Sequence, residues 1–151
     1  MNTSFKIWKK NREQLLAYFN KYSLEQLNKI PSGFSNNLIW NIGHVIVVQQ
    51  ALVYKGSGLE GYVSEELFKL YMPGTKPTGN TSQQEVDDLK GLLMLLLEKT
   101  EADFRNGKFV TYNERKVGEG FILSSFEDAH QFNNYHEGMH FGYMMNIRKF
   151  V

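Results

Sequence analysis

Four stretches of the sequence place apolar residues at every third or fourth position, and this spacing constrains the fold more than any other feature. The apolar residues that share one helical face in the first stretch are Phe5, Trp8, Leu15, Leu16 and Phe19. The other stretches cover residues 36–55, the chain after Ser82, and the chain from Ser124 or Ser125 towards the C-terminus. Because each apolar face must be buried against another, the pattern predicts an all-α four-helix bundle.

Two long connections refine this prediction. Residues 58–80 link the second and third helices, and we expect a short helix at residues 64–71 within them. Residues 106–123 link the third and fourth helices, and their signal for a turn or brief hairpin is weak. Such connections favour a bundle with a crossover connection over a plain up-and-down bundle. No linker divides the chain, so we expect one domain over residues 1–151.

The composition excludes several classes of protein. The 17 basic and 16 acidic residues are spread along the chain and leave a net charge of +1, so we expect no nucleic-acid partner. The N-terminus lacks the apolar core of a signal peptide, and no apolar run is long enough for a membrane span. We therefore expect a cytoplasmic protein with no membrane partner. The absence of cysteine excludes disulfides, thiolate metal ligands and a protein-borne sulfur nucleophile.

The strongest chemical signal is HEGMH at residues 136–140. On a helix, His136 and His140 project from one face at a spacing that lets two imidazoles bind one cation. A third histidine, His44, lies within the apolar second helix. Polar side chains on core-facing stripes cost stability unless they are paired or bound, so these histidines predict a three-histidine metal site. Three protein ligands leave one coordination position open.

Other interpretations of these histidines fit less well. H-E-x-x-H is also a zinc-protease signature, but no histidine or acidic residue follows His140 to act as a third ligand. EDAH and EGMH both match Glu-x-x-His, yet a di-iron site needs the two motifs on different, facing helices. His130 lies about three turns from His140 at the edge of the stripe, where we expect a flank residue rather than a ligand.

Charged and polar residues near the histidines are candidates for the chemistry. Arg12 projects to the centre of an apolar face, where it either forms a buried ion pair, with Glu137 or Glu127, or binds an anionic substrate group. Glu137 is the candidate catalytic base; pairing with Arg12 and exposure to solvent are its alternatives. The residues that we expect to line a substrate pocket are Arg12, Trp40, Asn41 and Asn133.

Three glycines lie beside the histidines, Gly43 before His44 and Gly138 and Gly142 around His140. A glycine inside a helix costs about 1 kcal/mol relative to alanine. Tolerance at a surface would explain them, but we favour a close approach of the second and fourth helices.

WNIGH at residues 40–44 and HEGMHFGY at residues 136–143 resemble the motifs of DinB-like domains, and GTKP at residues 74–77 extends the resemblance to nearly the whole chain. This superfamily of metal-binding four-helix bundles includes bacillithiol transferases. The resemblance implies a bundle with a crossover connection, often dimeric, that binds a divalent ion through His44, His136 and His140. In relatives this ion is usually zinc or nickel.

The resemblance also implies a function. Characterised relatives use the metal to activate a low-molecular-weight thiol, so we expect a thiol S-transferase or hydrolase that acts on a small molecule. Any thiol must be a cosubstrate, since the chain has no cysteine. The alternative is a non-catalytic metal-binding or structural dimeric bundle. Under either, we expect a homodimer interface on the second helix, which is apolar nearly all round through Leu38, Ile39, Ile42, Val45 and Ile46.

Overall fold

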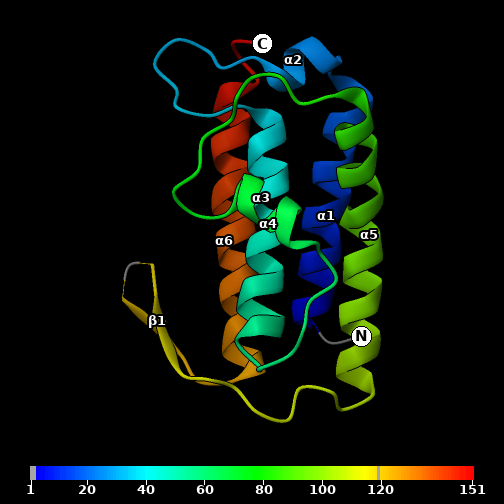
Figure 1. The fold of residues 1–151 in the computed structure, drawn as a ribbon, viewed down its shortest axis with the longest axis vertical. Helices are drawn as coiled ribbons and strands as arrows, with labels where there is room; N and C mark the ends of the chain where they lie inside the picture. Colours follow the sequence, from blue (N-terminus) through cyan, green and yellow to red (C-terminus); the bar gives the residue numbers. More distant parts are fainter. Residues whose placement is uncertain (1–2, 119) are drawn as a thin grey trace.

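Four long helices stand side by side in the computed structural model, which describes residues 3–118 and 120–151 (Figure 1). They are α1 (Thr3–Lys21), α3 (Leu38–Gln50), α5 (Gln83–Arg105) and α6 (Phe126–Ile147). A π-helical turn, η1 (Ala51–Lys55), prolongs α3. The connections contain the short helices α2 (Leu24–Asn28) and α4 (Glu65–Tyr71) and an antiparallel hairpin of β1 (Arg115–Val117) and β2 (Phe121–Leu123). The predicted all-α fold is confirmed.

The order of the helices in space requires one crossover. Helix α1 packs against α5 and α6, and α3 packs against the same two helices. Figure 1 shows that α3 and α5 run in the same direction, so residues 56–82 must return along the length of the bundle between them. This connection carries α4 across the outside of α3. The crossover bundle expected from the long connections is therefore the observed architecture.

Side-chain caps explain where the helices begin. Ser23 with Gln26 and Ser82 with Glu85 both form complete capping boxes, which satisfy backbone N–H groups that have no partner inside the helix. The Asn37 side chain accepts a hydrogen bond from the backbone N–H at the third position of α3. The two capping boxes could be identified from the sequence, because each depends on residues only three positions apart.

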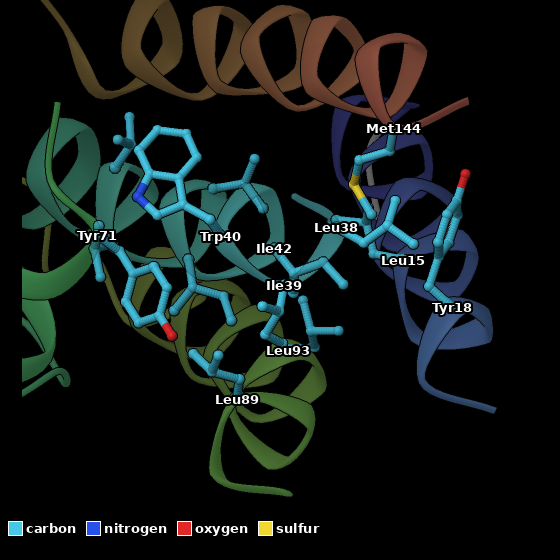
Figure 2. Packing of buried hydrophobic residues seen from close by; sticks show 14 of the residues in the cluster. Leu15, Tyr18, Leu38, Ile39, Trp40, Ile42, Tyr71, Leu89, Leu93 and Met144 are labelled. Carbon is cyan, nitrogen blue, oxygen red and sulfur yellow. The ribbon is translucent and has the colours of Figure 1, made fainter. Parts of the chain in front are cut away.

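Helix α3 is apolar nearly all round because the rest of the chain surrounds it. All of its residues are buried, and Figure 2 shows Ile39 and Ile42 among side chains that include Leu89 and Leu93 of α5. The homodimer interface predicted on this helix is therefore not supported, since α3 has no exposed side chain to offer a second copy. The homodimer itself stays a prediction. No helix in the described part of the chain has the length and apolar character of a membrane span.

Candidate metal centre

Three histidines from two helices meet inside the bundle. His44 comes from α3, whereas His136 and His140 lie one turn apart on α6, and one ligand atom from each lies within 4.8 Å of the other two. The ring centroids are 5.3 Å apart for His44 and His136, 4.7 Å for His44 and His140, and 4.5 Å for His136 and His140. The structure thus brings together the three residues that the sequence predicts as ligands, and the group can hold a divalent metal ion.

Hydrogen bonds orient two of the three rings. His44 Nδ1 lies 2.7 Å from the carbonyl oxygen of Tyr71, which only accepts, so Nδ1 donates and Nε2 keeps a free lone pair. His140 Nδ1 lies 2.8 Å from Asn41 Oδ1. The Asn41 amide is fixed by its Nδ2, which donates to the backbone oxygen of Asn37 at 2.7 Å. Both histidines therefore present Nε2 as a metal ligand, with the outer partner that such ligands normally have.

The electrostatics favour neutral imidazoles. Burial, followed by the nearby rings of His140 and His44, lowers the pKa of His136 to about 3. Burial, followed by the His44 ring, lowers the pKa of His140 to about 4. Burial also lowers the pKa of His44. At pH 7 all three rings are neutral, which is the form that binds a metal.

The donor set fits a resident divalent ion. His136 Nδ1 is a buried polar atom without a hydrogen-bond partner among the described residues, as expected of a ring whose partner is not part of the chain. Three uncharged nitrogen donors bind zinc and nickel alike, so the geometry fits either ion.

A cavity opens beside the cluster. His44 and His136 line a space of about 430 Å³, a size typical of small-molecule sites. Its apolar lining residues are Val48, Leu52, Pro73, Phe132, Tyr135 and Met139, and residues 115–118 of the hairpin complete the wall. A small molecule in this cavity would contact two of the three imidazoles.

Glu137 does not fit the predicted role of catalytic base. Its side chain is fully buried, and its Oε1 accepts hydrogen bonds from Trp8 Nε1 at 2.8 Å and from Asn133 Nδ2 at 3.0 Å. Arg12 forms an ion pair with the same carboxylate, with Nη2 2.7 Å from Oε1 and Nε 3.0 Å from Oε2. The structure therefore decides between the alternatives for Arg12 in favour of the buried ion pair. The carboxylate is held by these donors and does not belong to the wall of the cavity beside the histidines.

The four residues predicted to line a substrate pocket lie elsewhere, because none belongs to the wall of the cavity beside the histidines. Arg12 and Asn133 bind Glu137. Asn41 hydrogen-bonds to His140, and the Trp40 ring stacks on His44 with centroids 4.7 Å apart. Asn41 and Trp40 thus contact rings of the histidine cluster without lining the cavity.

The glycines do not mark the predicted close approach of the second and fourth helices. A Cβ on Gly43 would collide with the ring of Tyr71, so this glycine permits a close approach of α4 to α3. A Cβ on Gly138 or Gly142 would meet nothing within 4 Å. The approach at Gly43 matters for the site, because Tyr71 supplies the carbonyl that orients His44.

The remaining histidine lies outside the cluster, as the sequence predicts. His130 is 3% exposed, and its ring centroid lies 4.3 Å from that of Phe5 and 5.4 Å from that of Trp8. Neither ring nitrogen has a hydrogen-bond partner among the described residues. It is a buried member of an aromatic cluster.

The sequence interpretation missed the cavity wall. Phe132, Tyr135 and Met139 follow a helical spacing that keeps them close to His136 on α6, so periodicity alone was sufficient to find them. The contribution of residues 115–118 had no such signal, because it depends on how the hairpin folds back towards α6.

Comparison with known proteins agrees with this architecture. A family model described as the DinB superfamily matches residues 7–144, a range that contains His44, His136 and His140. A search of curated proteins finds no match. Since the family model covers all four long helices apart from the ends of α1 and α6, the chain belongs to the DinB superfamily.

Proposed function

We propose that the protein is a metal-dependent enzyme that acts on a small molecule, of the thiol S-transferase or hydrolase type. The observation that supports the proposal best is the junction of three neutral imidazoles with a cavity of about 430 Å³. Three protein ligands leave a coordination position for water or substrate, whereas a structural site is usually closed by four protein ligands. This difference favours the enzyme over a non-catalytic metal-binding or structural dimeric bundle.

The residues have separate roles in this proposal. His44, His136 and His140 hold the ion, for which zinc and nickel are the candidates, while the Tyr71 carbonyl and Asn41 Oδ1 keep two of the rings in place. When bound, the ion supplies Lewis acidity that lowers the pKa of a thiol or a water molecule at neutral pH.

The cavity accounts for the cosubstrate. The chain has no cysteine, so the thiol of an S-transfer reaction enters as a low-molecular-weight molecule. The apolar side chains of α6 that line the cavity provide a surface for the electrophile. If no thiol is used, the same arrangement supports hydrolysis of a small molecule.

A reconstitution assay tests the proposal. Protein purified without an affinity tag is stripped with a chelator, reloaded with zinc or nickel, and incubated with bacillithiol or glutathione and 1-chloro-2,4-dinitrobenzene. Formation of the thioether above the uncatalysed rate, dependent on metal, is the expected result. Ester and amide substrates, assayed in parallel, report hydrolysis.

Two variants make the assay specific. His136→Ala removes a proposed ligand and is expected to abolish the rate, while His130→Phe changes a histidine of the same helix outside the cluster and is expected to retain it. A rate that is unchanged by removal of the metal, or equal in the two variants, contradicts the proposal.

A further inference from the structure

The β1–β2 hairpin has two chemically different faces. In its antiparallel register Arg115 pairs with Leu123, Lys116 with Ile122, and Val117 with Phe121. Directly opposed residues share a face and successive residues alternate. One face therefore consists of Arg115, Val117, Phe121 and Leu123, and the other of Lys116 and Ile122.

Contacts show which face is turned towards the bundle. Leu123 is 3% exposed, and the Phe121 ring lies 5.3 Å from the ring of Phe132 and 5.6 Å from that of Tyr135, both on α6. On the opposite face, Ile122 is 64% exposed. The face that contains Arg115 is thus the one directed towards α6.

Arg115 brings a positive charge to the cavity of the metal centre. It lines the same space as His44, His136 and the apolar residues of α6. No ion pair joins its guanidinium to a carboxylate among the described residues. The buried Arg12, in contrast, has its counter-charge in Glu137. Arg115 is an exposed residue, so it lies where the largely apolar cavity meets solvent. An arginine without a counter-charge at this position is a site for an anion that arrives with the ligand.

Lys116 serves as a natural comparison. Its atoms also contribute to the wall of the cavity, but the alternation of the strand places its side chain on the face of the exposed Ile122. The two neighbouring cations carry the same charge and differ in the direction of their side chains. Only Arg115 shares its face with the residues that contact α6.

We propose that Arg115 binds the anionic group, a carboxylate, sulfonate or phosphate, of the small molecule that enters this cavity, while an apolar part of the same molecule packs against Phe132, Tyr135 and Met139. The planar guanidinium donates two parallel hydrogen bonds to such oxygens. The statement that this molecule is a substrate rests on the proposed function, but the binding of the anion does not.

A pair of probes with one aromatic body tests the assignment. Naphthalene-2-sulfonate is anionic, and 2-(methylsulfonyl)naphthalene is its neutral counterpart. Their affinities are measured by isothermal titration calorimetry on chelator-stripped protein, where neither probe has a metal to bind. The wild-type protein is expected to bind the sulfonate about 10-fold more tightly than the sulfone, a ratio typical of a charge-assisted hydrogen bond.

Variants then assign the preference to one side chain. Arg115→Gln is expected to remove the preference for the sulfonate and leave the affinity for the sulfone unchanged. Arg115→Lys is expected to restore part of it, and Lys116→Gln to keep it within about twofold, since the Lys116 side chain lies on the face of the strand opposite to the residues that contact α6. Circular dichroism checks that each variant has the wild-type helix content.

Three outcomes overturn the inference: equal affinities of the two probes for the wild type, no loss in Arg115→Gln, or an equal loss in Lys116→Gln. Because the binding is measured without metal, it is independent of catalysis. Arg115-dependent binding in a protein without turnover contradicts the proposed function alone, whereas metal-dependent turnover without Arg115-dependent binding contradicts the inference alone.

Discussion

Two polar clusters lie next to each other on α6, and they differ in what balances their polarity. Glu137 is fully buried, and side chains of α1 and α6 provide its ion pair and its hydrogen bonds. One residue earlier, His136 joins His44 and His140, whose Nδ1 atoms are hydrogen-bonded, at the edge of a cavity. The first cluster joins α1 to α6 through protein side chains alone, whereas the second can hold a metal ion.

Loss of the Glu137 carboxylate is the largest effect that we predict. Glu137→Ala leaves the Arg12 guanidinium buried at 0% exposure without a counter-charge, so the free energy of unfolding is expected to fall by about 3–5 kcal/mol. Urea denaturation followed by circular dichroism measures this change. A loss below about 1 kcal/mol would show that the pair is not a structural element.

A double variant separates charge from packing. Glu137→Leu with Arg12→Met replaces the buried pair by apolar side chains and is expected to recover much of the stability. Metal content should be unaffected in the double variant, because neither residue lies in the histidine cluster. Loss of bound metal in the double variant would show that the ion pair and the histidine cluster are not independent.

His130 adds a third case to the comparison, because it is buried and neither of its ring nitrogens has a hydrogen-bond partner among the described residues. Burial lowers its pKa in the folded protein to about 4, from an ordinary value near 6.5. Above pH 6.5 the ring is neutral in both states; between about pH 6.5 and 4 only the unfolded chain takes up a proton. Stability is therefore expected to decrease as the pH falls through this window, by an amount on the order of 3 kcal/mol.

The comparison of wild type with His130→Phe isolates this contribution from that of the other titrating groups. The difference between their unfolding free energies should be constant above pH 6.5 and should change in favour of the variant as the pH approaches 4. Parallel curves for the two proteins would indicate that His130 is protonated in the folded state or reaches solvent.

Replacement of Asn41 tests whether its hydrogen bond to His140 supports metal binding, and the expected effect is smaller. Asn41→Leu removes the acceptor that orients His140, so metal affinity is expected to fall by about 10–100-fold. Asn41→Asp keeps an acceptor at this position and should retain most of the affinity. Competition with a chelating dye measures the metal affinity of both variants. Equal affinities for the wild type and Asn41→Leu would show that Asn41 does not support metal binding.

The helices and the metal ligands were predictable because their signals are strong and regular. Ser82 and Glu85 mark the start of α5 from three residues apart, and His136 and His140 share a face through the fixed pitch of a helix. Even His44, on a different helix, was recognisable as a polar side chain within an apolar segment.

The surroundings of the ligands were not predictable in the same way. Glu137 carries the charge expected of a base, and only the packing of α1 against α6 shows that Arg12 and Trp8 enclose it. Gly43 lies beside His44 in the sequence, but its neighbour Tyr71 belongs to the crossover connection. The part of the cavity wall that residues 115–118 supply also depends on contacts between distant segments, and a single sequence does not encode these as a local pattern.

The most direct test of the comparison is the metal content of untagged protein, measured by inductively coupled plasma mass spectrometry. We predict about one divalent ion per chain in the wild type and in His130→Phe, and little or none in His44→Ala, His136→Ala and His140→Ala. A wild-type protein without a divalent ion, or a metal content that is unchanged in His44→Ala and His136→Ala, would contradict the assignment of the histidine cluster as a metal centre.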